Sequence, residues 1–352
     1  MVFKKKPIRV LIVDDSAFMR RVVREMLESD PGIEVVGAAR DGQEGVEMTL
    51  ELDPDVVTMD IEMPRMNGLE AIDAIMARSP RPILVFSSIT SEGAEVTLEA
   101  LDKGAADYVE KTIARSVLDV LQVKKDFVEK VKAVSRRRRI IAASVKKTAT
   151  PYVRPPVHKT ASHVTDLVVI GTSTGGPRAV QQVLPGIPKD VDAAFVIAVH
   201  MPQAFTKAFA ERMNAHCALP VKEAEDGEQI RAGRVLVAPG GVQTLIERRS
   251  AASAKIHLTK EPASSIYRPC IDLTIGSAAE AYGSRAMGVI LTGMGHDGKE
   301  GIAAIKKKGG WALAQDEASC TVYGMPKAIV DAGLADVISP LDKISEEIVK
   351  LL

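Results

Sequence analysis

Residues 167–184, LVVIGTSTGGPRAVQQVL, join a run of branched apolar residues to helix-like sequence through a polar, glycine-rich turn. The apolar run is typical of a buried strand in a parallel sheet. Pro177 suits the first turn of the helix that follows. Ligands of open α/β sheets bind at such turns, at the carboxyl ends of strands. The turn could therefore hold a phosphate or present Ser173 as a nucleophile.

Strand and helix patterns alternate on both sides of this turn. Strand-like segments follow it at 193–200, 234–240, 255–260, 286–293 and 311–316, and helix-like segments at 204–214, 271–283, 299–309 and 341–352. Before it, amphipathic, helix-like stretches separate further strand-like runs. These runs lie at 8–13, 33–39, 55–59, 82–88 and 107–110. This order implies parallel sheets with helices on both faces. We expect an α/β protein with two doubly wound parallel-sheet domains.

The composition changes sharply between the two series. Residues 1–132 carry 25 acidic and 18 basic side chains, whereas residues 133–165 carry eight basic and no acidic ones. The latter stretch contains prolines and no sustained hydrophobic period, as linkers do. We therefore expect one domain over 1–132, a basic flexible linker over 133–165 and a second domain over 166–352. The run Arg136–Arg139 could contact nucleic acid or anionic lipid, or could lie solvated at a helix end.

Composition excludes several classes of protein. A chain of 352 residues can form about two separate cores, and its formal net charge of zero does not point to nucleic acid. Three widely spaced cysteines form neither a disulfide framework nor a CxxC zinc site. The apolar run 8–13 is too short for a signal peptide, and no run approaches the roughly 18 residues of a membrane helix. We expect a cytoplasmic protein without membrane insertion.

Acidic residues cluster at strand ends in the first domain. Asp14 and Asp15 follow the first predicted strand, and Asp60 follows the third. These carboxylates repel one another at the shared edge of the sheet unless a hard cation such as Mg²⁺ joins them. Ser87 and Lys111 end two further strands and could contact phosphoryl oxygens. The alternative is that the aspartates only cap helices and turns.

The turn at Ser173 fits one of two templates better than the other. A dinucleotide-binding turn needs G-x-G-x-x-G and an acid about 20 residues on, but Ser173 replaces the middle glycine and the next strand ends in His200. The stretch Gly171–Gly175 instead matches the nucleophile elbow G-x-S-x-G. That short pattern also occurs by chance, so the reading depends on a base for the serine.

His200 and Asp297 are the partners that the predicted topology offers to Ser173. Each follows a predicted strand, so all three should meet at one edge of the sheet. The order Ser–His–Asp differs from that of α/β-hydrolases, so that fold is not implied. His296 is a rival base, although its side chain should diverge from that of its neighbour Asp297.

The first domain resembles a known family over residues 8–131, the receiver domain of two-component response regulators. This resemblance implies that Asp60 accepts a phosphoryl group and that Asp14, Asp15 and the backbone carbonyl of Glu62 complete its Mg²⁺ site. Ser87 matches the switch hydroxyl of the family, and Lys111 its phosphate-pairing lysine. Thr112 stands where the family usually has proline, so the cis peptide often found there is not expected.

The second domain resembles the catalytic domain of chemotaxis protein-glutamate methylesterases. Four motifs carry the likeness: IGTSTGGP, VIAVHMP, ILTGMGHDG and CTVYGMP. The resemblance implies Ser173 as nucleophile, His200 as general base and Asp297 as the group that orients it. Thr174 then lies beside the nucleophile, and the N–H of Met294 donates to the oxyanion. Cys270 stands where we expect serine or a similar residue, and no base for it is evident in the sequence.

The two resemblances together imply an enzyme controlled by phosphorylation. Its substrates would be methylated chemoreceptors, whose glutamate methyl esters it would hydrolyse and some of whose glutamines it would deamidate. A chemotaxis histidine kinase would be the phosphodonor, Mg²⁺ would bind only in the receiver, and nucleic acid would not be a partner. The alternative functions are a response regulator whose output domain binds DNA or one whose output domain binds nucleotide.

Overall fold

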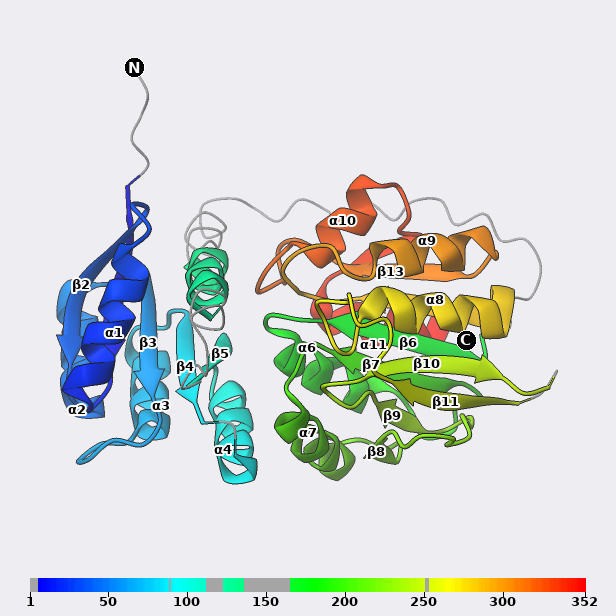
Figure 1. The fold of residues 1–352 in the computed structure, drawn as a ribbon, viewed down its shortest axis with the longest axis horizontal. Helices are drawn as coiled ribbons and strands as arrows, with labels where there is room; N and C mark the ends of the chain where they lie inside the picture. Colours follow the sequence, from blue (N-terminus) through cyan, green and yellow to red (C-terminus); the bar gives the residue numbers. More distant parts are fainter. Residues whose placement is uncertain (1–5, 89, 112–122, 136–164, 251–252) are drawn as a thin grey trace, which may run out of the picture. The chain divides into compact units, whose positions relative to one another are not determined.

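The structure, a computed structural model, describes residues 6–88, 90–111, 123–135, 165–250 and 253–352. The chain divides into two compact units, Met1–Ala149 and Thr150–Leu352, each built around a parallel sheet (Figure 1). The expectation of two parallel-sheet α/β domains is confirmed.

The N-terminal unit contains a five-stranded parallel sheet of order β2-β1-β3-β4-β5. The strands are β1 (Ile8–Val13), β2 (Ile33–Ala39), β3 (Val56–Asp60), β4 (Ile83–Ser87) and β5 (Asp107–Glu110). The strand order changes direction at β1, which lies between β2 and β3. In the register of this sheet Val13 pairs with Met59, so Asp14 follows β1 beside the residue Asp60.

Four helices of the N-terminal unit begin at polar capping residues. They are α1 (Ala17–Glu28), α2 (Gly42–Leu52), α3 (Gly68–Arg78) and α4 (Ser91–Asp102), and their N-caps are Ser16, Asp41, Asn67 and Thr90. Each cap side chain accepts a hydrogen bond from a backbone N–H of the first turn, which stabilises a helix end by about 1 kcal/mol. The caps fix where each helix leaves the edge of the sheet.

A further helical segment covers residues 123–135 and packs on the sheet. Its Phe127 is almost fully buried and meets Phe86 of β4 edge to face, with 5.1 Å between ring centroids. The helix runs through 135, so residues 133–135 continue it, although the sequence predicts the linker to begin there. Residues 136–164, the rest of the predicted linker, lie outside the described residues.

The C-terminal unit contains a seven-stranded parallel sheet of order β14-β13-β12-β6-β7-β9-β8. Its strands are β6 (Leu167–Thr172), β7 (Ala194–Val199), β8 (Val221–Glu223), β9 (Val235–Val237), β12 (Ala286–Ile290), β13 (Trp311–Gln315) and β14 (Val337–Ser339). β6 lies in the middle and is buried along its whole length. β7 and β12 flank it, so their carboxyl ends lie next to the turn at Ser173.

Two strands of this unit form a separate antiparallel hairpin. β10 (Gln243–Arg248) pairs with β11 (Ala254–Thr259), and β10 packs against α8 (Ile271–Tyr282). The sequence predicts residues 255–260 as a strand of the βα series, but the structure places them outside the parallel sheet. Only five residues join the two strands, which is too few for a parallel crossover.

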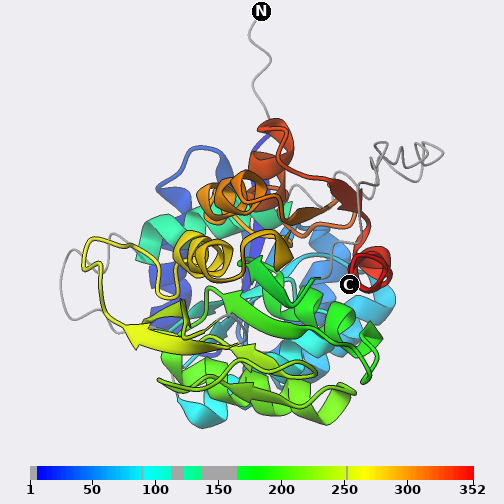
Figure 2. The same cartoon turned by 90° about the vertical axis from the view of Figure 1, so that its right-hand side faces the viewer.

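Helices cover the seven-stranded sheet. Besides α8 they are α6 (Gly176–Val183), α7 (Gln203–His216), α9 (Lys299–Lys307), α10 (Met325–Asp331) and α11 (Ile344–Lys350). α8 and α9 lie side by side and share a buried cluster with strands of the sheet (Figure 2). None of the helices in the described part of the chain combines the length and apolar character needed to cross a bilayer.

Replacing the fully buried Phe195 of β7 with alanine should strongly destabilise the C-terminal unit. The lost burial and the remaining cavity should lower the free energy of unfolding by about 3–5 kcal/mol. Trp311, the only tryptophan of the chain, lies in this unit, so its fluorescence in urea follows the unfolding. Lys207→Ala on the exposed side of α7 is the control and should change stability little. Equal, small losses in both variants would contradict the prediction.

Candidate functional site

Ser173 lies on a sharp strand-to-helix turn at the carboxyl end of β6. Its N–H donates to the carbonyl of Thr292 at 3.1 Å, and its own carbonyl accepts from the N–H of Gly176 at 2.7 Å. α6 begins at Gly176, so one short turn separates the strand from the helix. The serine is half-buried while its neighbours in the turn are buried. This is the strand–turn–helix context that a nucleophile elbow requires.

Two glycines allow the backbone to pass close to Ser173. Gly175 has φ of +73°, and a Cβ there would lie 2.5 Å from the Thr321 side chain. Gly293 approaches from the end of β12, and a Cβ there would lie 3.0 Å from the Cβ of Ser173 and 2.2 Å from the Sδ of Met325. A larger residue would be strained by the positive φ at Gly175 and would displace Met325 or Ser173 at Gly293.

Thr292 joins the turn to the neighbouring strand end. Its carbonyl accepts from the Thr172 hydroxyl at 2.6 Å as well as from Ser173, and its own hydroxyl donates to the carbonyl of Thr174 at 3.0 Å. Its N–H donates to the side chain of Gln315 on β13 at 2.7 Å. Thr172, Thr174 and Thr292 are all buried, so these bonds are shielded from water. Thr292 thus holds the turn, a role that no motif in the sequence indicates.

His200 lies between Ser173 and Asp297, as the topology predicts. Its Nδ1 is 3.2 Å from the Ser173 Oγ, and its Nε2 is 2.8 Å from the Asp297 Oδ2. A carboxylate only accepts hydrogen bonds, so Nε2 carries the proton and Nδ1 of the neutral ring is left to accept the serine hydroxyl proton. The arrangement can therefore move a proton from the serine to the imidazole.

Asp297 is held at the N-terminus of α8. The backbone N–H groups of Ile271 and Asp272 donate to its two oxygens at 2.8 and 2.9 Å. Burial raises the pKa of Asp297, but the hydrogen bond and charge of His200 and the two N–H donors outweigh burial and bring it to about 2. The positive end of the helix favours the same ionised form. Asp297 is therefore a carboxylate throughout the ordinary pH range.

Cys270 lies next to the same carboxylate. Its thiol donates to the Asp297 Oδ1 at 3.4 Å. Burial, together with the charges of Asp297 and Asp272, raises the pKa of Cys270 to about 11, although a backbone hydrogen bond acts in the opposite direction. The thiol is therefore protonated near neutral pH, and a protonated thiol is a poor nucleophile.

His296 and Met294 lie in the connection after β12. His296 is exposed. Among the described residues, the histidine that contacts Ser173 and Asp297 is His200 and not the rival base His296. Met294 is half-buried and directly follows Gly293, the residue that approaches Ser173. Its N–H as an oxyanion donor, and the role of Thr174 beside the nucleophile, stay predictions.

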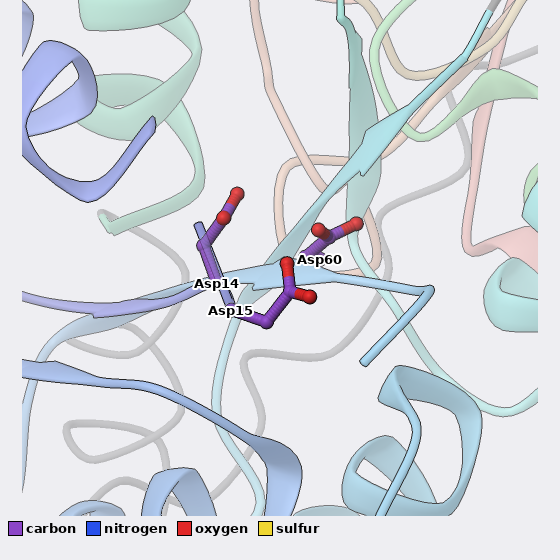
Figure 3. Close-up of side chains that lie close together, drawn as sticks. All are labelled: Asp14, Asp15 and Asp60. Carbon is purple, nitrogen blue, oxygen red and sulfur yellow. The ribbon is translucent and has the colours of Figure 1, made fainter. Parts of the chain in front are cut away.

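The receiver unit brings Asp14, Asp15 and Asp60 together at the carboxyl ends of β1 and β3 (Figure 3). One oxygen of each lies within 4.8 Å of those of the other two. Burial and the nearby Asp60 raise the pKa of Asp14 to about 6, against the opposing effects of the Ser16 N–H and Lys111. The buried Asp14 Oδ2 has no hydrogen-bond partner among the described residues. Such a set of oxygens fits a hard divalent cation such as Mg²⁺.

Lys111 and Ser87 lie at neighbouring strand ends. The Lys111 Nζ is 2.6 Å from the Asp60 Oδ1, and the Lys111 N–H donates to the Ser87 carbonyl. The Ser87 hydroxyl contacts α4, where it bonds with Thr97 and the carbonyl of Gly93. Lys111 thus already faces the predicted phosphoryl acceptor, while the Ser87 hydroxyl is bonded towards the helix.

Two receiver predictions concern the loops. Glu62 lies two residues beyond Asp60 with an exposed side chain, and its carbonyl as a Mg²⁺ ligand stays a prediction. Thr112 lies outside the described residues. The loop after Asp60 returns close to that residue at Gly68. Only glycine fits there, because a Cβ would lie 2.1 Å from the Asp60 carbonyl oxygen.

Comparison with known proteins matches both units to families. A family model described as CheB methylesterase matches residues 168–348, and one described as response regulator receiver domain matches residues 10–121. The chain is 48% identical to protein-glutamate methylesterase/protein-glutamine glutaminase 1 of Oleidesulfovibrio alaskensis, with 97% of this chain and 98% of that one covered. A protein of Pseudomonas putida named protein-glutamate methylesterase/protein-glutamine glutaminase of group 1 operon is 46% identical, with 97% and 99% covered.

A solved structure resembles the C-terminal unit. The crystal structure of the Thermotoga maritima CheB methylesterase catalytic domain aligns with a TM-score of 0.52 and 41% identity. The alignment covers 53% of this chain and 99% of that one. The likeness is therefore to one whole domain of this two-domain chain.

Asp297→Asn should slow the reaction of Ser173 with a serine-directed phosphonate roughly a thousandfold or more. An amide in place of the carboxylate no longer selects the imidazole tautomer whose Nδ1 accepts the serine proton. Phosphonylation is followed by mass spectrometry. His296→Gln is the control, because His296 is the neighbouring, exposed histidine and should leave the rate unchanged. Rapid labelling of the Asp297→Asn variant would show that Asp297 is not the group that orients His200.

Mg²⁺ binding to the receiver should weaken about tenfold between pH 7 and pH 5. With a pKa of about 6, Asp14 is about nine-tenths ionised at pH 7 and about one-tenth at pH 5, and the metal must displace the proton. Calorimetric titration of the full chain with Mg²⁺ at both pH values measures the change. Asp14→Asn, which cannot titrate there, should bind weakly at both. An affinity independent of pH in the unaltered chain would contradict the prediction.

Proposed function

Because this chain belongs to the CheB methylesterase family, with a receiver domain before the methylesterase domain, we propose that it hydrolyses glutamate methyl esters on chemoreceptors. We propose further that it deamidates particular receptor glutamines, and that phosphorylation of the receiver activates both reactions. The observation that carries this proposal is the continuous hydrogen-bonded series from Ser173 through His200 to Asp297.

Acylation begins when His200 Nδ1 takes the hydroxyl proton of Ser173 and the serine Oγ attacks the ester carbonyl carbon. Asp297 stabilises the imidazolium that forms, because it remains ionised and fixed by α8. The oxyanion of the tetrahedral intermediate accepts a hydrogen bond from the backbone N–H of Met294. When the carbon–oxygen bond to the methoxy group breaks, the imidazolium returns its proton and methanol leaves.

Deacylation repeats these steps with water as the nucleophile. His200 accepts a proton from water as the water oxygen attacks the acyl-serine carbonyl carbon. The imidazolium then returns that proton to the Ser173 Oγ as the ester bond breaks, which frees the glutamate carboxyl group and Ser173. With a glutamine substrate the same steps release ammonia in place of methanol. Thr292 keeps the serine turn in position through both stages, since it bonds the turn on both sides of the nucleophile.

Phosphorylation of Asp60 by a chemotaxis histidine kinase is the proposed control. Asp14, Asp15, Asp60 and the carbonyl of Glu62 would hold Mg²⁺, which neutralises the charge of the incoming phosphoryl group. Lys111 pairs with Asp60 and would move to a phosphoryl oxygen, and the Ser87 hydroxyl would turn from α4 towards another. Activation is then a shift in the populations of two receiver conformations.

The alternative functions lack support at the site. A nucleotide-binding turn would need glycine at Ser173, whose hydroxyl instead contacts His200. DNA binding would depend on Arg136–Arg139, which lie outside the described residues.

We propose that this protein acts in the cytoplasm, on receptors and without inserting into the membrane. All three cysteines are free thiols, as is usual for proteins of the reducing cytoplasm.

Methanol release from methylated receptor membranes tests the function directly. Ser173→Ala should lower release by roughly three orders of magnitude or more, since the nucleophile is lost. Ser284→Ala, a serine remote from the turn in sequence, is the matched control and should release methanol normally. A small-molecule phosphodonor with Mg²⁺ should stimulate the unaltered chain but not Asp60→Asn. Normal release by Ser173→Ala would refute the esterase mechanism, and equal stimulation of Asp60→Asn would refute the proposed control.

A further inference from the structure

The ring of Tyr267 stacks on the imidazole of His200. The ring centroids are 4.2 Å apart and the ring planes differ by 10°. Tyr267 lies in the loop between β11 and α8, 67 residues along the chain from His200, and is 43% exposed. No motif in the sequence indicates a role for this tyrosine. One face of the imidazole is therefore covered by an aromatic ring that lies at the surface of the site.

The loop that carries Tyr267 also contacts the carboxylate of the site. Three residues further on, Cys270 contacts Asp297 through its thiol, and Ile271 and Asp272 contact it through their N–H groups. Residues 267–272 therefore touch two of the three members of the Ser173–His200–Asp297 series. A displacement of this short segment would move the ring that covers His200 together with the donors that hold Asp297.

Gln243 bonds to both ends of the segment 267–270 of this loop. Its side-chain N–H donates to the backbone carbonyl of Tyr267 at 2.9 Å, and its side-chain amide oxygen accepts from the backbone N–H of Cys270 at 2.7 Å. Gln243 is fully buried on β10, so both bonds are shielded from water. The neighbouring N–H of Gly241 donates to the carbonyl of Arg268 at 3.0 Å. The hairpin that lies outside the parallel sheet thus fixes where the loop passes His200.

We propose that Tyr267 is a positioning residue for His200, held in place by Gln243. The aromatic face restrains the imidazole to the plane in which Nδ1 meets Ser173 and Nε2 meets Asp297. It also presents the negative face of its π-system to the imidazolium that forms as the serine proton is transferred. This inference rests on the proposed esterase function only for the identity of the substrate, because the transfer from serine to histidine precedes any chemistry particular to glutamate esters.

Substitutions at Tyr267 separate an aromatic face from simple bulk. Tyr267→Leu keeps apolar cover over the imidazole but removes the π-face, whereas Tyr267→Phe keeps the ring. We expect Leu to lower kcat for methanol release, and the rate of Ser173 phosphonylation, about tenfold with KM within about twofold. Phe should retain rates near those of the unaltered chain. Ile266→Ala, at the 84%-exposed neighbour, is the control and should leave the phosphonylation rate unchanged.

Two further measurements distinguish positioning from a general loss of structure. Stacking shifts the carbon-bound ring protons of His200 upfield, so their NMR signals should move downfield in Tyr267→Leu and stay in place in Tyr267→Phe. The Trp311 fluorescence transition in urea shows that each variant is folded. Gln243→Met removes both anchoring bonds at similar volume and should reproduce the slower phosphonylation and the NMR shift.

The outcomes decide the two proposals separately. The positioning role is overturned if Tyr267→Leu labels Ser173 at the normal rate, if Tyr267→Phe is as slow as Leu, or if only KM changes. The anchoring role is overturned if Gln243→Met matches the unaltered chain. A chain that is rapidly phosphonylated but releases no methanol refutes the proposed substrate, and the phosphonylation rates still decide the role of Tyr267.

Discussion

The carboxylate of Asp297 at the N-terminus of α8 is the constraint on which the rest of the candidate active site depends. Ile271 and Asp272 donate to its oxygens, and these bonds and His200 together overcome the effect of burial on its pKa. An ionised acceptor at that point determines which nitrogen of His200 carries the proton. That in turn leaves Nδ1 to face Ser173. Without the helix end, the same carboxylate would be a buried charge with too few partners.

Both units place their chemistry by the same topological rule. In a parallel sheet the carboxyl ends of all strands meet at one edge, so residues that are far apart in sequence come together there. β1 and β3 bring Asp14 next to Asp60, and β6, β7 and β12 bring Ser173 next to the residues that follow the other two strands. The two sites differ because the receiver edge collects three carboxylates, a set that suits a cation, while the other edge collects the Ser173 hydroxyl, the His200 imidazole and the Asp297 carboxylate.

Particular elements show how far the sequence predicts the fold. The apolar spacing of AFMRRVVREMLE predicts a helix, and α1 covers the same residues; the structure adds that Ser16 caps its N-terminus. The sequence of β11 is recognisable as a strand, but it does not show with which strand β11 pairs. Alternation of β-branched residues is the same in a strand of a parallel sheet and in a strand of a hairpin. The short strands β8 and β14 lie outside the strand segments that the sequence predicts.

The sequence by itself determined the residue types, their order and the strand ends at which they stand, which suffices to predict Ser173, His200 and Asp297 as one group. Only the tertiary structure decided the contacts that hold this group in place. Tyr267 stacks on His200, Gln243 anchors its loop, and Thr292 joins the serine turn to β12. The physical reason is that these contacts depend on how a hairpin and a helix end pack against the sheet edge, and no local spacing or propensity encodes that packing.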